Sequence, residues 1–350
     1  MKLHPSPFHF ALGLSTLGAL SVLGCAPGPG DLAVRVKPEI TIKSGVFAGR
    51  GRENMRDGWS ATFDKYVVAL GPVFVSKLTD ASQTDESHET FVVDLKRVPE
   101  NGVELWELSG LEEGRWNFGF ELSNGGHHAE RHSSVTKEDF QRIVDEDLTY
   151  LIEGSISKEG GLSCPPQALV AASNRAPAGQ SPDGSDCFEA ETVAFSFAVR
   201  APTVFDACEL DGLPGVAIGS GSVRTTSITL HGDHMFFNGF PVGDEGSVRR
   251  LAQWIADCDL NLDGVVTEAE LERIPLGALA AIDPDVYQLG GSPIELETAF
   301  DFLQAELKTQ GHMESEGECR VDGVAHDHDH GDEEDHGDEE DHGAAGARGK

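Results

Sequence analysis

The sequence lacks the short motifs that identify the common enzyme classes. It contains no G-x-S-x-G nucleophile motif, no H-E-x-x-H zinc motif, no C-x-x-C pair and no glycine-rich phosphate-binding loop. These absences argue against a serine hydrolase, a zinc protease, a dithiol redox protein and a nucleotide-binding protein. A metallohydrolase that uses His231, Asp233 and His234 stays open as an alternative, but it needs a further ligand and a base that the sequence does not identify. We therefore expect a binding protein and not an enzyme.

Basic residues are scarce in this chain of 350 residues. It has 26 Lys and Arg against 60 Asp and Glu, which gives a formal net charge of -34. A surface of this sign repels phosphate groups and attracts cations. Because no basic stripe is present, we expect no nucleic-acid partner, and we expect metal ions to be the ligands.

The apolar run that marks targeting is confined to the first 25 residues. An apolar stretch from Phe8 to Leu23 follows a short basic start, and it ends at residues 22–25, which read VLGC. The stretch is typical of an export signal and not of a spanning helix. Residues 22–25 resemble the lipobox of bacterial lipoproteins.

The lipobox resemblance implies where the protein is located. It implies a signal peptide over residues 1–24, lipidation of Cys25 and a short linker over residues 25–31. The protein would then be anchored to the bacterial cell envelope, and Ala26 favours the outer membrane over the inner one. Ordinary signal cleavage near the same position is the alternative.

The strongest binding signal is the twelve-residue segment DLNLDGVVTEAE, residues 259–270. Oxygen-bearing side chains alternate along its first half, Gly264 permits a sharp turn, and a glutamate ends it. This segment resembles the calcium loop of the EF-hand family. The resemblance implies that Ca²⁺ is bound by Asp259, Asn261, Asp263, the carbonyl of Val265, Thr267 and Glu270.

The flanks of this loop agree with the family in part. Apolar residues at helical spacing precede it, as an entering helix requires; they are Leu251, Trp254, Ile255 and Cys258. Pro275 limits the exiting helix to roughly two turns. EF-hands usually pair, yet the sequence has no second loop of this kind, so Val266 must pack on another part of the chain or on a second copy. We expect a modest affinity, ~10⁻⁴ to 10⁻³ M.

Six cysteines indicate which disulfides this exported chain can form. With Cys25 assigned to the lipid anchor, five remain for an oxidising compartment, and an odd number leaves at least one unpaired within the chain. Cys164 and Cys187 bracket a segment rich in Pro, Gly, Ser and Ala, and they are the first expected disulfide. Cys208 and Cys319 are the second candidates. Cys258 lies on the apolar face of the expected entering helix and is interpreted as a small buried residue.

Short apolar or alternating segments separated by turn residues predict a mainly β fold. The predicted strands are 32–36, 59–75, 89–95, 103–108, 115–122, 149–156, 192–198 and 225–230. We expect an antiparallel β-sandwich-like domain over residues 32–245, interrupted by a helix over residues 136–145.

The remaining chain divides into a helical part and a tail. Residues 246–312 are predicted to form a smaller α-helical EF-hand unit, which includes an amphipathic helix from Ile294 to Lys308. Whether this unit is independent or packs on the sandwich is left open. Residues 313–350 are predicted to be a disordered tail, because they are acidic and too polar to form a core.

Histidines suggest a second class of metal. The tail repeats the unit HGDEED and contains His326, His328, His330, His336 and His342. Neutral imidazoles beside carboxylates bind Zn²⁺ or Cu²⁺. Two loops offer further candidates, namely His231, Asp233 and His234 in one and His127, His128 and His132 in the other. His312 and Cys319 would complete a site if the chain returns past His231, whereas histidines that only bond backbone carbonyls are the alternative.

Together these patterns predict a calcium-ion-binding lipoprotein of the cell envelope with a structural or interaction role. The alternative is a periplasmic or surface lipoprotein that binds copper or zinc through its histidines. The expected partners are metal ions and, through the anchor at Cys25, the membrane.

Overall fold

The structure is a computed structural model that describes residues 28–171, 175–240 and 248–321. The predicted signal peptide, Cys25 and the tail histidines His326, His328, His330, His336 and His342 lie outside these described residues. The chain is mainly β, with 43% strand and 14% helix, which confirms the predicted fold class. Among the described residues, no helix is both long enough and apolar enough to cross a membrane.

The strands of the described residues form three sheets. One has four strands in the order β18-β16-β1-β5, a small one has three in the order β10-β11-β9, and the long sheet has 12 strands along the path β14-β13-β6-β2-β8-β12-β17, with side strands paired to it. The strands are β1 (Gly30–Pro38), β2 (Ser60–Lys77), β3 (Asp80–Glu86), β4 (Phe91–Asp94), β5 (Val103–Leu111), β6 (Gly114–Leu122), β7 (Glu130–Arg131), β8 (Tyr150–Ser157), β9 (Leu162–Ser163), β10 (Gly179–Gln180), β11 (Asp186–Glu189), β12 (Thr192–Val199), β13 (Thr203–Leu210), β14 (Leu213–Pro214), β15 (Val216–Ile218), β16 (Val223–Leu230), β17 (Val265–Thr267), β18 (Gly311–Met313) and β19 (Glu318–Val321).

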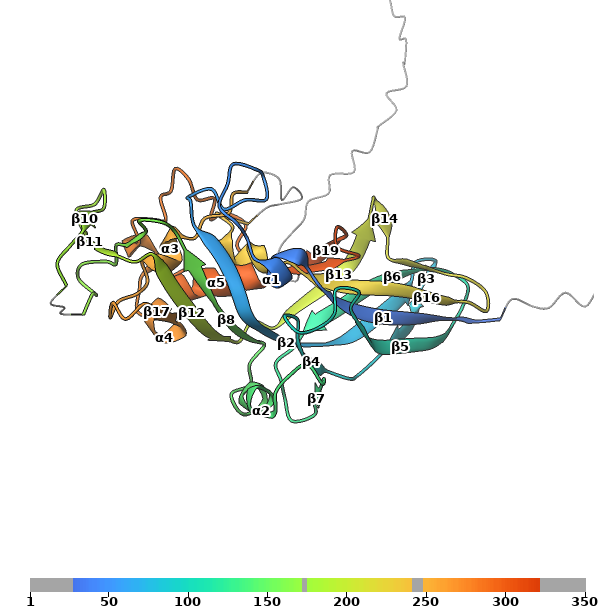
Figure 1. The fold of residues 1–350 in the computed structure, drawn as a ribbon. Helices are drawn as coiled ribbons and strands as arrows, with labels where there is room; N and C mark the ends of the chain where they lie inside the picture. The colour runs from blue at the N-terminus through green and yellow to red at the C-terminus, as the bar shows by residue number, and fades with distance from the viewer. Residues whose placement is uncertain (1–27, 172–174, 241–247, 322–350) are drawn as a thin grey trace, which may run out of the picture.

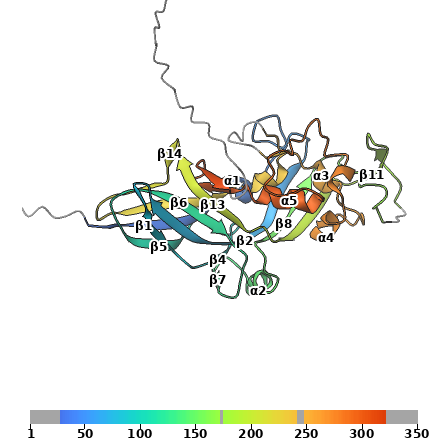
Figure 2. The same cartoon turned by 180° about the vertical axis from the view of Figure 1, so that it is seen from behind.

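The helices are short. They are α1 (Ile40–Ser44), α2 (Lys137–Asp145), α3 (Gln253–Ala256), α4 (Glu268–Leu271) and α5 (Ala299–Leu307), with 3-10 turns η1 (Gly232–Phe236) and η3 (Leu276–Ala278). In Figure 1, β1, β5 and β16 lie over one half of the long sheet, and α3, α4 and α5 lie at the other half. From behind, α5 lies in front of β8 (Figure 2).

β2 belongs to both halves and has a core on each of its faces. Tyr66, Val68 and Leu70 alternate into the main core, whereas Val67 and Ala69 point into a smaller cluster that includes Ile143 of α2. This alternation follows from the period of two in a strand. The strand thus joins the sandwich half to the half that carries the helices.

The main core runs without a break from the predicted sandwich domain into the predicted helical unit. Phe63 and Phe195 of the sheet belong to the same cluster of buried residues as Trp254, Ile255 and Phe302 of the helical part. The aromatic rings of Trp254 and Phe302 contact each other edge to face, with centroids 5.3 Å apart. In this structure the helical part is therefore packed on the sheet.

All eight predicted strands and the predicted helix over residues 136–145 are present, the helix beginning after its cap Thr136. The predicted entering helix is wrong over most of its length, because α3 has only four residues. Its first part is extended, since Leu251 N–H donates to the Phe236 carbonyl and the Arg250 carbonyl accepts from Arg56 N–H. The helix predicted to begin at Ile294 begins five residues later, where Thr298 and Asp301 form a capping box.

Both predicted disulfides are present. Cys164 bonds to Cys187 and Cys208 bonds to Cys319, while Cys258 is buried as a free thiol. The second bond joins β13 to β19 across 111 residues of sequence. It therefore holds the chain that follows α5 and β18 against the long sheet. The tail predicted to be disordered from residue 313 is thus ordered through Val321, because β19 pairs with β13 and is bonded to it.

Candidate metal centres

The predicted calcium loop is wound around its first residue. The carboxylate of Asp259 accepts hydrogen bonds from the N–H groups of Asp263 at 3.1 Å and Gly264 at 2.9 Å. The side-chain oxygen of Asn261 also accepts from Asp263 N–H, at 2.8 Å, and the Asp263 carboxylate accepts from Val265 N–H at 2.9 Å. Gly264 has a φ of 85°, so it makes the turn that was expected at the sixth position.

Glu270 closes the loop from α4. One of its carboxylate oxygens accepts from Leu260 N–H at 3.1 Å, and the other accepts from the N–H and the hydroxyl of Thr267, both at 3.0 Å. Asp259 and Glu270 are 2% and 6% exposed. The first and last ligand residues of the loop are thus folded toward each other inside the protein.

The carboxylates of the loop repel one another. Burial is the main cause that raises the pKa of the Asp259 carboxyl, and the negative charges of Glu270 and Asp263 raise it further, against the hydrogen bond from Gly264 N–H. A bound dication offsets this repulsion. The ligand atoms of the loop side chains are all oxygens, which suits Ca²⁺ as a hard cation.

Val266 packs on the sheet of this same chain. β17, which contains it, pairs in parallel with β12, and Val266 lies opposite Phe195. Both side chains are buried in the main core. In an EF-hand pair, the strand that contains Val266 would pair with a second loop. In this chain β12 takes that place.

Three histidines from distant parts of the chain form a second group. His231 and His234 lie at η1, directly after β16, and His312 lies in β18. One ligand nitrogen from each ring lies within 4.8 Å of those of the other two. The antiparallel pairing of β16 with β18 sets Leu230 opposite Gly311, and this register brings His231 and His312 together, with ring centroids 4.2 Å apart.

Neighbouring groups orient two of these rings. Nε2 of His231 donates to the Ser315 carbonyl at 2.8 Å, which leaves Nδ1 as its ligand atom in the neutral ring. Nδ1 of His234 lies 2.8 Å from the Thr309 hydroxyl, which itself donates to the Glu306 carbonyl at 2.8 Å. The Thr309 oxygen therefore accepts from Nδ1–H, and Nε2 becomes the ligand atom of His234.

Asp233 and Cys319 have roles other than those expected. Nε of Arg250 donates to the Asp233 carboxylate at 2.6 Å, and both side chains are buried. Although burial opposes ionisation, the charge of Arg250 and its hydrogen bond hold the pKa of the Asp233 carboxyl below its ordinary value. Asp233 is thus an ion-pair partner beside the histidines, and Cys319 is in a disulfide and not available as a ligand.

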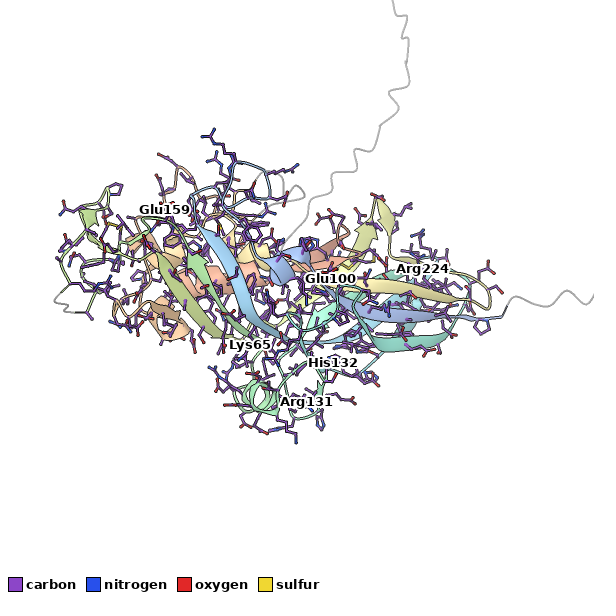
Figure 3. The ribbon with its side chains drawn as sticks, in the orientation of Figure 1. Lys65, Glu100, Arg131, His132, Glu159 and Arg224 are labelled. Atoms are coloured by element: carbon purple, nitrogen blue, oxygen red, sulfur yellow. A yellow bond between two sulfur atoms is a disulfide. The ribbon has the colours of Figure 1, made fainter. Side chains whose placement is uncertain are left out.

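His127, His128 and His132 are not brought into a comparable group. Within the described residues, the group of three converging ligands consists of His231, His234 and His312. His127 and His128 are exposed, and Nδ1 of His132 lies 2.9 Å from the Ser134 hydroxyl. In Figure 3, His132 lies beside Arg131 on the side of the molecule where α2 lies.

A pocket of about 400 Å³ opens beside the three-histidine group. His231, Asp233 and Arg250 line it, together with the acidic side chains of Glu39, Glu53 and Glu316. His234 and His312 lie deeper, at 1% and 4% exposed. His231 thus connects the buried rings to the surface.

Arg250 is the residue of this region that sequence reasoning missed. Its guanidinium also pairs with Glu53 at 2.6 Å and lies over the ring of Phe237. The motif HGDH contains an acid between two histidines, but nothing local in the sequence identifies the arginine that neutralises it. Comparison with protein-family models, curated proteins and solved structures finds no match for this chain.

Proposed function

We propose that this chain is a calcium-ion-binding protein in which residues 259–270 hold Ca²⁺ as an EF-hand loop. The main support is the position of Glu270, whose carboxylate reaches back to Leu260 N–H at 3.1 Å. The twelfth residue is thereby folded over the first, which a bidentate closing ligand requires. The burial of Asp259 and Glu270 adds to this support, because two buried carboxylates are stabilised by a dication.

The proposed role of the ion is structural. The loop follows α3, contains β17 at the end of the long sheet and runs into α4, which contacts α5. Ca²⁺ that binds this folded loop and not the unfolded chain stabilises the fold by mass action, by about 2.7 kcal/mol at 100 times the dissociation constant. An opening switch is disfavoured because α4 has only four residues before Pro275.

Replacing Glu270 by Gln tests this proposal. We expect calorimetric titration of the full chain to give one Ca²⁺ per molecule and Glu270→Gln to weaken binding by about 100-fold, because the bidentate ligand is lost. Ca²⁺ should also raise the thermal midpoint of the wild-type protein and not that of the variant. Glu268→Gln is the matched control, since Glu268 lies on the same helix and pairs with Arg142 instead. Equal Ca²⁺ affinity in Glu270→Gln and wild type would contradict the proposal.

We also propose that the protein is exported and attached to the bacterial cell envelope through lipid on Cys25, with the outer membrane favoured. The two disulfides support an oxidising compartment. Mass spectrometry of the mature amino terminus checks this proposal, and we expect an acylated Cys25 as the first residue. An uncleaved or unacylated terminus would exclude the anchor.

A further inference from the structure

We propose that His231, His234 and His312 bind one borderline transition-metal ion, Cu²⁺ or Zn²⁺, separately from the calcium loop. The inference goes beyond the calcium function, because it assigns a different class of metal to a different part of the fold. The ligand atoms are Nδ1 of His231, Nε2 of His234 and a ring nitrogen of His312.

The spacing of the three rings suits a single ion after a small movement. Nitrogen ligands 2.0–2.1 Å from a tetrahedral metal lie roughly 3.4 Å from one another. The three nitrogens lie within 4.8 Å of one another, so ligation requires an inward shift on the order of 1 Å.

The rings are held by groups that a metal site commonly uses. A ligating imidazole usually donates its second N–H to a fixed oxygen, which sets its tautomer and orientation. The Ser315 carbonyl does this for His231, and the Thr309 hydroxyl does it for His234. In this assignment the other two nitrogens, Nδ1 of His231 and Nε2 of His234, are the ligand atoms.

The donor set selects the class of metal. The group contains three imidazoles and neither a carboxylate nor a thiolate. Imidazole suits Cu²⁺ and Zn²⁺, whereas Ca²⁺ and Mg²⁺ require oxygen ligands. Asp233 does not change this preference, because Arg250 already neutralises its carboxylate. By the general order of divalent affinities, Cu²⁺ should bind more tightly than Zn²⁺.

The adjacent pocket gives the ion a path to the buried rings. His231 lines this pocket, whose acidic side chains outnumber its basic ones; they are Glu39, Glu53, Asp233 and Glu316 against Arg52 and Arg250. Acidic groups around an opening raise the local concentration of cations. Because the protein contributes three ligands, water or another small donor from the pocket completes the coordination.

The test uses the full chain with its five tail histidines replaced by Asn, so that the tail does not contribute to the titration. We expect this background protein to bind one tight equivalent of Cu²⁺, and its electron paramagnetic resonance spectrum to show hyperfine coupling to three nitrogens. His312→Gln should weaken binding by more than about 100-fold, since losing even an outer-shell partner costs 10–100-fold.

Two further variants complete the test. Thr309→Val leaves all three ligands in place, and we expect it to weaken Cu²⁺ binding by about 10–100-fold as a positioning residue. If His312→Gln does not fold, the Cu²⁺ affinity of Thr309→Val tests the proposal in its place. His132→Gln is the control for an unrelated histidine, and Glu270→Gln should bind Cu²⁺ as the background does. Background affinity in both His312→Gln and Thr309→Val, or a spectrum without histidine coupling, would overturn the proposal.

Discussion

Replacing Asp233 by Ala should lower the free energy of unfolding by about 3–5 kcal/mol, the usual cost of removing one partner of a buried ion pair. Asp233 and Arg250 are 2% and 5% exposed. Without the carboxylate, the guanidinium of Arg250 keeps the exposed Glu53 and the Arg52 carbonyl as partners, but it loses its buried counterion. Urea unfolding at pH 7 measures the effect.

A double variant separates the loss of charge balance from simple loss of packing. Asp233→Leu combined with Arg250→Met removes both charges and keeps apolar volume, so we expect it to recover most of the stability lost by Asp233→Ala. Glu53→Ala is the control, since the Glu53 side chain is 74% exposed and should contribute little. A loss below about 1 kcal/mol for Asp233→Ala would show that the pair does not hold η1 in place.

Removing the Cys208–Cys319 disulfide should have an effect of similar size. The two cysteines are 111 residues apart, and closing a loop of that length stabilises the folded state by about 4.8 kcal/mol through the entropy of the unfolded chain. The same relation gives about 3.4 kcal/mol for Cys164–Cys187, which are 23 residues apart.

The two disulfides therefore serve as controls for each other. Cys208→Ala with Cys319→Ala should destabilise the protein more than Cys164→Ala with Cys187→Ala, when unfolding is measured without reductant. The reverse order would mean that native contacts, and not loop length, determine what these bonds contribute. The longer loop also contains His231, His234 and His312, so its loss should loosen their arrangement.

Local pattern was sufficient to predict eight of the 19 strands in the described residues, because alternating burial follows directly from the strand period. β13 was missed for a physical reason. Its pairing with β19 shifts between Asp206 and Glu209, and Ala207 has a φ of 48°, so the alternation of its side chains is broken. A bulge of this kind depends on the partner strand, which the local sequence does not reveal.

The two candidate metal centres differ in how far sequence predicts them. All ligands of the calcium loop lie within twelve residues, so spacing alone places them. The histidine group depends on a register between β16 and β18, whose paired residues are about 80 positions apart. That register placed His312 beside His231 as anticipated. Cys319 instead forms a disulfide with Cys208, and Asp233 pairs with an arginine that sequence did not connect to it.

The three-residue strand β17 covers part of an edge of the long sheet. It is the last strand of the long sheet, and it covers β12 opposite Ala194, Phe195 and Ser196. An open sheet edge offers unsatisfied peptide groups that recruit strands from other molecules. Because β17 pairs with the middle of β12, the loop that carries it keeps the peptide groups there from a strand of another molecule.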